Sequence, residues 1–501
     1  MSDSHAAYDS LLDHLRQLAR VISIHEQLAW DELTLLPEAA TEYRGQQLAY
    51  LAGLQHELTC DPRMDDWLVA AETSGDSRET QATRINIDEL RRRHRLCQLQ
   101  PKSLVEELAR VTTTAQHEWA LARETDDFGR FAIWLERVIK LKREQARCWT
   151  AGDDLYEPLV AEYEPGLPYV VIRETLAELS RSLPEVLQDR LAGQRIPASK
   201  APLLGDFPEG EQRALCERIA NGLGFDFLRG RLDTAVHPFT THLSAHDCRI
   251  AIRFNDHNLA PVISVLLHEL GHALYDQGLP PEHHGEPVGE PISLSVHESQ
   301  ARLWENAVGR SVGFWRYLVP QIETAFPATK GLWSTEQIVA HLNHVSPGTN
   351  RVTADEVTYN LHILLRVELE QALLRGDLAV RDLPAAWNEA YRRGLGVTPD
   401  SDREGCLQDG HWAAGMFGYF PTYTLGNVLM AMLYERVQQD LGSLDGQFAR
   451  GEFHTLQDWL KTNLFQYGKR LTTAEWVRQI DPRATVSGLD VAPLLRRCRV
   501  K

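Results

Sequence analysis

Apolar side chains recur every three or four residues along most of the chain, which is the period of an amphipathic helix. Over residues 8–59 this period predicts two helices, separated at Pro37 because the residue before a proline disfavours helical geometry. Further helices are expected over residues 80–97, 102–123, 128–150, 171–192, 210–223 and 383–394. Residues 158–168, with their prolines and a glycine, are expected to interrupt the series. The pattern predicts a mainly α-helical fold.

Residues 233–255 depart from the helical period. They contain several β-branched residues and a proline, and apolar and polar side chains alternate from Asp247 to Phe254. Alternation with a period of two is typical of a half-buried strand. We therefore expect a small β-sheet just before the next long apolar segment, and an edge strand of such a sheet can pair with an extended peptide.

That apolar segment carries the clearest chemical motif, H-E-x-x-H, formed by His268, Glu269 and His272. On a helix, residues four apart project from one face, so the two imidazoles can bind one zinc ion. Glu269 is then placed to take a proton from the attacking water. A buried core helix with two structural histidines is the alternative reading of the motif taken alone.

The third protein ligand decides between classes of zinc site. The metzincin pattern requires glycine at position 275 and histidine at position 278, where this chain has Tyr275 and Gly278, so that class is excluded. Thermolysin-like sites instead use a carboxylate as the third protein ligand and leave the fourth position to water. A carboxylate is therefore expected downstream.

A second helical pattern, residues 293–306, follows a loop rich in proline and glycine. A helix, a loop and a returning helix can bring Glu298 beside the two histidines. Glu305, seven residues later on the same face, is a rival ligand. Ser295-x-x-Glu298 also fits a capping box, which would give Glu298 a purely structural role. The spacing alone leaves these alternatives open.

A site that recognises a chain end must hold a free carboxylate, and arginine does this best through two parallel hydrogen bonds. Arg249 and Arg253 are candidates on the expected strand. Arg351 is a third candidate, because Thr353-x-x-Glu356 fits a capping box that opens a long helix beside it. The positive end of that helix favours an anion.

Aromatic residues and glycines gather between residues 405 and 426. Such a stretch suits the wall of a site, with His411 and Tyr423 as its polar tips. Either side chain, or His237, can donate a hydrogen bond to a developing oxyanion. A helix packing on a loop explains the same residues equally well.

The composition narrows the class of partner and compartment. The 501 residues carry a formal net charge of −18, and the scattered acidic residues argue against binding to nucleic acid or to anionic membranes. The start of the chain lacks the features of a signal peptide, and no apolar run approaches the length of a membrane span. Without a repeat or a low-complexity linker, the simplest organisation is one domain over residues 1–501.

Seven cysteines are present, an odd number, and they are widely spaced without a C-x-x-C pair. This usage predicts reduced thiols in a cytoplasmic protein.

Together, these stretches resemble the thermostable (Taq-type) metallocarboxypeptidases, peptidase family M32. The similarity begins at Trp30-Asp31 and extends through most of the chain. The remaining stretches that carry it are His237-Pro238-Phe239, the H-E-x-x-H helix, His297-Glu298-Ser299-Gln300, Arg351-x-x-Ala354-Asp355, Gly405-x-x-Gln408-Asp409-x-His411-Trp412 and the aromatic run to Gly426. One position departs from the family pattern, because Ala251 stands where the family tends to have threonine.

The resemblance implies a long-helix zinc-peptidase fold with a deep substrate groove and the small sheet beside the metal site, usually as a homodimer. It implies zinc bound by His268, His272 and Glu298, and it also points to Arg351 as the residue that binds the substrate's carboxylate. It also implies release of C-terminal residues from peptides with broad preference, but poorly next to proline.

Two alternatives to a carboxypeptidase remain at this point. A zinc oligo-endopeptidase would use the same metal chemistry on internal bonds. A non-catalytic helical scaffold would use the histidines structurally and would contain no stoichiometric zinc. Co²⁺ or Mn²⁺ can replace zinc in a site of this donor type.

Overall fold

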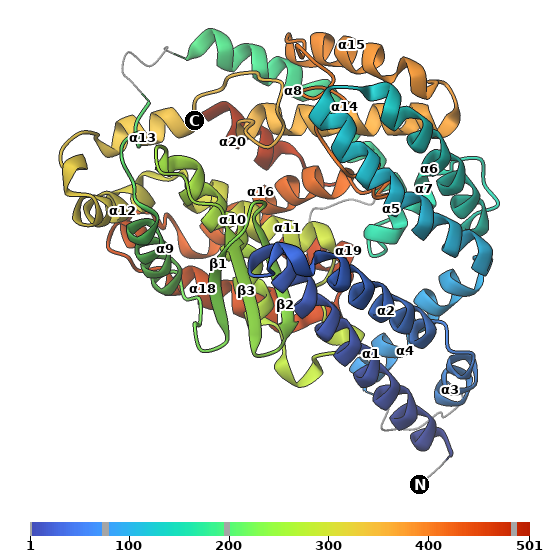
Figure 1. Ribbon diagram of the computed structural model, residues 1–501. Coiled ribbons are helices and arrows are strands. Elements are labelled where there is room, and N and C mark those ends of the chain that lie inside the picture. The colour runs from blue at the N-terminus through green and yellow to red at the C-terminus, as the bar shows by residue number, and fades with distance from the viewer. Residues whose placement is uncertain (1–2, 73–79, 195–200, 482–487, 501) are drawn as a thin grey trace.

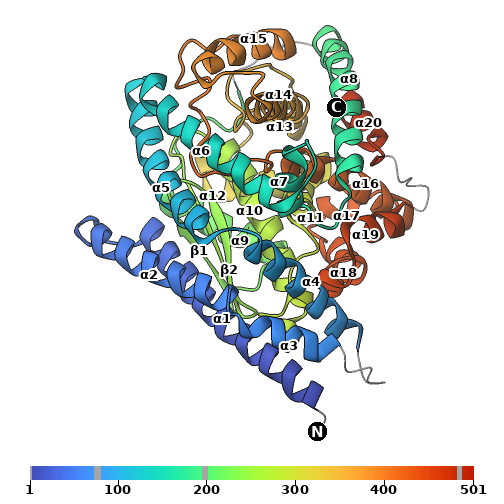
Figure 2. The ribbon, with the colours of Figure 1, turned by 90° about the vertical axis from the view of Figure 1, so that its right-hand side faces the viewer.

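The computed structural model describes residues 3–72, 80–194, 201–481 and 488–500. It is built almost entirely of helices around one small sheet, as expected from the hydrophobic period. Figures 1 and 2 show the first four helices as a layer on one side of the molecule, with α10 and α11 near its centre. The first four are α1 (Asp3–Thr34), α2 (Thr41–Thr59), α3 (Arg63–Glu72) and α4 (Gln81–Gln98).

The break at Pro37 is confirmed, because a short 3₁₀ turn, Glu38–Ala40, separates α1 from α2. The helix α3 is an element that the period did not predict, since only three of its residues are buried. The next five helices are α5 (Lys102–Thr125), α6 (Phe128–Trp149), α7 (Tyr156–Tyr163), α8 (Tyr169–Gly193) and α9 (Glu209–Gly222). The expected interruption over residues 158–168 is wrong in its first half, where α7 holds Pro158 in its first turn. Proline is tolerated there because the first amides of a helix have no acceptor within it.

The predicted sheet is present and has three strands: β1 (Gly230–Thr234), β2 (Phe239–Ser244) and β3 (Asp247–Ile252). β3 lies in the middle, parallel to β1 and antiparallel to β2. The long helix α10 (Leu259–Gly278) packs against β2 and β3, so the sheet lies beside the H-E-x-x-H motif. Ala251 of β3 is fully buried and packs in a small apolar cluster with Trp30 and the partly buried Phe239. The methyl group therefore makes apolar contacts at the position where the family tends to have threonine.

After β3, the described residues of the chain form helices joined by loops, without a further strand. The elements after α10 include α11 (Leu294–Arg302), a π-helical turn (Leu303–Val308), α12 (Val312–Ala325), α13 (Thr335–Leu342), α14 (Glu356–Arg375), α15 (Leu383–Leu395), α16 (Pro421–Leu441), α17 (Asp445–Ala449), α18 (His454–Asn463), α19 (Thr473–Ile480) and α20 (Ala492–Val500). One hydrophobic core extends from Leu104 to Cys498, and a smaller cluster joins α1, α3 and α4.

The capping box predicted at Thr353 is wrong, and the alternative one at Ser295 is not formed either. The side chain of Ser293, not Ser295, accepts the hydrogen bond at the start of α11. At the start of α14, Asp355 accepts from the amides of Val357 and Thr358, and Thr353 lies outside the helix. In each case another side chain that can cap was close by in the sequence, and the backbone geometry selected it.

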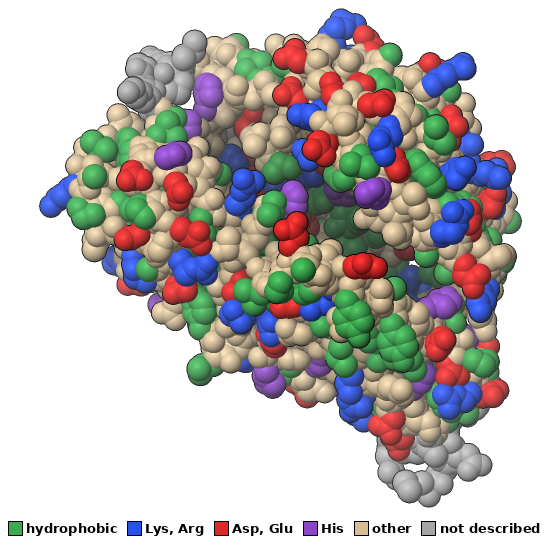
Figure 3. Space-filling view, viewed as in Figure 1, with side chains coloured by type: hydrophobic (Ala, Val, Ile, Leu, Met, Phe, Trp, Pro, Cys, Tyr) green, Lys and Arg blue, Asp and Glu red, His purple; other side chains and the backbone are tan. Residues whose placement is uncertain are grey.

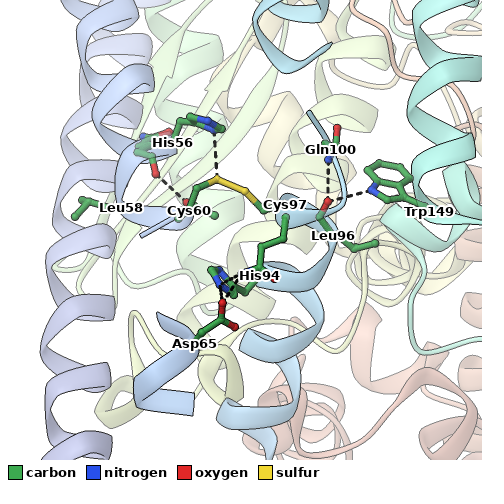
Figure 4. The surroundings of a disulfide bond; sticks show 12 residues. His56, Leu58, Cys60, Asp65, His94, Leu96, Cys97, Gln100 and Trp149 are labelled. Atoms are coloured by element: carbon green, nitrogen blue, oxygen red, sulfur yellow. Dashed lines mark hydrogen bonds and ion pairs between the residues drawn. A yellow bond between two sulfur atoms is a disulfide. The ribbon is translucent and has the colours of Figure 1, made fainter. Parts of the chain in front are cut away.

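The prediction of seven reduced thiols is wrong for one pair. Cys60 follows the last turn of α2, Cys97 lies in the last turn of α4, and their sulfur atoms form a disulfide (Figure 4). The pair is 37 residues apart, so only the fold, which places the ends of α2 and α4 together, reveals it. The other five cysteines are free. Among the described residues, no helix has both the length and the apolar character needed to span a bilayer.

Candidate metal centre

The two histidines and the carboxylate predicted as metal ligands lie together. His268 and His272 project from α10, and Glu298 projects from α11, with one possible ligand atom from each lying within 4.8 Å of the others. The two helices can approach this closely because of Gly271. A Cβ atom there would lie 2.4 Å from the backbone oxygen of Gln300 on α11. Only glycine, which has no side chain, allows this approach at position 271.

The distances fit a tetrahedral metal site. The Nε2 atoms of His268 and His272 lie 3.9 and 3.6 Å from Oε2 of Glu298. Two donors about 2.1 Å from one tetrahedral ion stand about 3.4 Å apart, so the donors need to move little to bind one. Two imidazoles and one carboxylate form the donor set of catalytic zinc sites of the thermolysin type. The residues present therefore suit a zinc ion.

Glu305 contacts His268 from the side away from this cluster. Its Oε2 lies 2.9 Å from Nδ1 of His268, and it accepts hydrogen bonds from Arg302 and Ser264. Burial raises the pKa of Glu305, but Arg302 and His268 outweigh that effect and hold the pKa at about 2. The ionised carboxylate thereby fixes the ring of His268 so that Nε2 faces the cluster. Glu305, the rival ligand, thus lies behind His268 and orients its ring, and it is not one of the three clustered ligand residues.

The other two ligands are supported in a similar way. Arg302 donates from Nε to Oε1 of Glu298 at 2.7 Å, which leaves Oε2 toward the histidines. The ring of His297 stacks on His272 with 4.4 Å between centroids, and its Nε2 lies 3.0 Å from Asp276. The sequence analysis gave no role to Arg302 or Asp276. Both lie four residues after a predicted ligand, and this helical spacing was the available signal.

Glu269 is buried, with 7% of its surface exposed, and faces the sheet. The hydroxyl of Thr240 on β2 lies 2.9 Å from Oε2 of Glu269. Burial raises the pKa of Glu269, against the opposing effects of His268 and the Thr240 hydrogen bond. A carboxylate with a raised pKa is a better proton acceptor near neutral pH.

The side chains of His411, Tyr423 and Arg351 lie together and form one wall of the candidate site. Nε2 of His411 lies 3.0 Å from the hydroxyl of Tyr423, and the guanidinium of Arg351 lies 4.9 Å from the centre of the Tyr423 ring. Tyr423 lies near Glu298, because three residues later Gly426 lets α16 touch that ligand. A Cβ atom at Gly426 would lie 2.5 Å from Cγ of Glu298. This contact joins the wall to the metal centre.

The guanidinium of Arg351 already makes hydrogen bonds within the protein. It is 8% exposed, and Asp409 accepts from its Nη2 at 2.8 Å and its Nε at 3.3 Å. Its Nη1 donates to the hydroxyl of Tyr359 at 3.1 Å. A guanidinium has five N–H donors, so one donor on each Nη atom stays available to a ligand.

The remaining predicted residues lie elsewhere. His237 is exposed on the connection between β1 and β2 and is outside the contacts described above. Arg249 pairs with Asp247 on its own strand at 2.7 Å. Arg253 lies just past the end of β3 and is exposed, so the expectation that it lies on the strand is wrong.

Figure 3 shows the surface hollowed at the centre of the viewed face, with histidine and basic side chains along the walls of the hollow. In Figure 1, seen from the same side, α10 and α11 lie close to this part of the molecule.

The chain matches known proteins over nearly its whole length. The family model described as carboxypeptidase Taq (M32) metallopeptidase matches residues 10–501. Thermostable carboxypeptidase 1 of Thermus thermophilus is 40% identical over 489 residues, covering 96% of both chains. Carboxypeptidase 1 of Bacillus subtilis is 32% identical, covering 93% of both.

Solved structures agree with these matches. The M32 carboxypeptidase of Deinococcus radiodurans superposes with a TM-score of 0.93 and 35% identity, covering 99% of this chain and 98% of that one. Metallocarboxypeptidase 1 of Trypanosoma cruzi gives a TM-score of 0.92 and 32% identity, covering 99% and 100%. The resemblance and the helical fold class are thereby confirmed. The chain belongs to the carboxypeptidase Taq (M32) family of metallopeptidases, and it is a metallocarboxypeptidase that hydrolyses peptide bonds.

Proposed function

We propose that the chain is a zinc carboxypeptidase that removes residues of many kinds from the free C-terminus of peptides. His268, His272 and Glu298 would hold the zinc. The observation that carries this is the cluster of three possible ligand atoms within 4.8 Å, supported from behind by Glu305 and Arg302. Co²⁺ and Mn²⁺ are accepted by the same donor types, so each is a possible substitute.

Zinc, when bound, polarises the scissile carbonyl and lowers the pKa of the attacking water. Glu269 accepts the proton of that water and then delivers it to the departing amine, and Thr240 keeps its carboxylate oriented. His411 and Tyr423 share a hydrogen bond at 3.0 Å, and one of the two is proposed to donate to the developing oxyanion. His237 is proposed to contact the substrate from the connection between β1 and β2.

Arg351 is proposed to bind the substrate's terminal carboxylate through the free donor on each Nη atom. Asp409 supports this role because it holds the opposite edge of the guanidinium and is itself held by Arg366 at 2.7 Å. A fixed planar fork loses little freedom when it binds a carboxylate.

Arg351→Ala is expected to lower kcat/KM on free-acid peptides. The loss should correspond to about 2–4 kcal/mol of transition-state stabilisation, since a charge-assisted pair is lost from a largely buried site. Arg351→Lys should keep only part of the wild-type kcat/KM, because an ammonium group cannot form two parallel hydrogen bonds to a carboxylate. The measurement is kcat/KM for matched free-acid and amidated peptides. On amidated peptides the wild type should already be slow, and the substitution should add little.

Arg249→Ala serves as the matched control, because Arg249 was a rival candidate and pairs with Asp247 instead. It should leave the preference for free acids unchanged. Equal cleavage of free and amidated peptides by the wild type would favour the oligo-endopeptidase alternative and remove the role of Arg351. The scaffold alternative is not retained, because family membership makes the chain a peptide hydrolase.

The proposal also includes a homodimer, a cytoplasmic location, a deep substrate groove and one domain over residues 1–501. The family match over residues 10–501 supports the single domain, and the hollow in Figure 3 supports the groove. The five free cysteines support a reducing compartment, whereas the disulfide between Cys60 and Cys97 is the observation against it. The homodimer follows from the resemblance, and sedimentation of the purified protein tests it.

A further inference from the structure

Glu164 is a fully buried carboxylate outside the residues assigned so far. It follows the last turn of α7, and its side chain accepts hydrogen bonds from three described donors. Oε1 accepts from the backbone amide of Ser295 at 2.7 Å and from the hydroxyl of Thr422 at 3.2 Å, while Oε2 accepts from the hydroxyl of Ser295 at 2.7 Å. These three donors are all neutral groups.

The donors belong to the first turns of two helices. Ser295 lies in α11, three residues before Glu298, and Thr422 lies in α16, next to Tyr423. First-turn amides have no acceptor within their own helix, and the positive helix end favours an anion. Glu164 therefore joins the start of the helix that carries the third ligand to the start of the helix that carries the aromatic wall.

The contact between α11 and α16 is close at the ligand itself, since Gly426 packs against the side chain of Glu298. A small rotation of either helix would therefore displace the Glu298 carboxylate or press it against the α16 backbone. We propose that Glu164 is a positioning residue of the metal centre, which fixes the starts of α11 and α16 so that Glu298 meets the two histidines. This inference depends on the ligand role proposed for Glu298.

Burial raises the pKa of Glu164 to about 7, although the hydrogen bonds from Ser295 and its neighbours oppose the rise. Because this pKa is above that of an unfolded glutamate, the group costs folding stability as the pH rises from about 4.5 to about 7.

Glu370 offers a matched control. It is also fully buried, burial also raises its pKa to about 7, and it accepts from the hydroxyl of Tyr156, from Nε1 of Trp412 and from the amide of Gly418. These three donors lie outside α11 and α16. Removing either carboxylate leaves comparable buried donors unpaired, but only the loss of Glu164 acts directly on the helix of Glu298.

The experiment measures the zinc dissociation constant of purified, folded variants by competition with a chromophoric chelator. Glu164→Ala is expected to weaken zinc binding roughly 10- to 100-fold, the scale for groups that orient metal ligands. It should also lower kcat at saturating zinc more than it changes KM. Glu164→Gln should stay within about tenfold of wild type, because the amide oxygen still accepts and the Ser295 hydroxyl can accept from the new amide. Glu370→Ala should leave zinc affinity within about twofold.

Wild-type zinc affinity in Glu164→Ala, or equal weakening in Glu164→Ala and Glu370→Ala, would overturn the inference. If Glu164→Ala does not fold, Ser295→Ala replaces it, and wild-type zinc affinity in that variant would count equally against the role. Glu298→Ala is measured in parallel to separate the two proposals. Retained zinc in that variant defeats the proposed ligand set, whereas its loss there with no change in Glu164→Ala defeats only this inference.

Discussion

Glu269→Gln is expected to lower kcat by roughly 100-fold or more, the usual scale for the loss of a positioned acid–base group. The amide has nearly the same shape and still accepts the Thr240 hydrogen bond, which is 2.9 Å long in the wild type. It cannot accept the proton of the attacking water. Zinc content and thermal stability should therefore stay close to wild type while turnover falls, and steady-state kinetics with a free-acid peptide measure the loss.

Thr240→Val provides the control for this result. It removes the hydroxyl that orients Glu269 but keeps the carboxylate, so a much smaller loss of kcat is expected than for Glu269→Gln. A Glu269→Gln enzyme within a few-fold of wild type would take this residue out of the mechanism.

The second large effect concerns the metal ligands. Alanine at His268, His272 or Glu298 should remove bound zinc and activity together, because three protein ligands leave no redundancy. Metal content after dialysis, measured by plasma mass spectrometry, gives zinc per chain directly. Activity should not return when zinc is added at micromolar concentration.

Glu305→Ala is the informative comparison. Its carboxylate only orients His268, so this variant should keep its zinc with an affinity roughly 10- to 100-fold weaker than wild type. The opposite pattern, one zinc per chain in Glu298→Ala and none in Glu305→Ala, would mean that the wrong carboxylate has been assigned.

The local patterns predicted much of the fold. Helices that bury one wide apolar face, such as α5 and α6, were found within about two residues at each end, because burial imposes the period directly. The helix α3 was missed because it buries only three side chains, which is too few to establish a period. The capping residues were misassigned because several side chains near α11 and α14 can cap, and only the backbone path selects one.

In the site, too, local spacing identified some residues, whereas contacts between distant residues could not be predicted. The motif of His268 and His272 is local and could be read from spacing, whereas Glu298 and Glu305 lie on one helical face and spacing could not separate them. The contacts of Arg351 with Asp409, and of Glu164 with Ser295, join residues 58 and 131 positions apart. The disulfide pair has the same character. Such pairs depend on the packing of whole helices, which a single sequence does not encode in any short pattern.

Because of the π-helical turn at Leu303–Val308, the geometry of the site depends on the number of residues in this segment. A π-turn contains one residue more than the corresponding α-helical turn, and Glu305 lies within it. Deleting one residue there would restore regular α-helical winding, and Glu305, which lies inside the turn, would then point in a different direction relative to Glu298. Glu298 and Glu305 could then no longer both serve His268. An insertion or deletion in this turn would therefore separate the metal ligand Glu298 from its support Glu305, even if both side chains were kept.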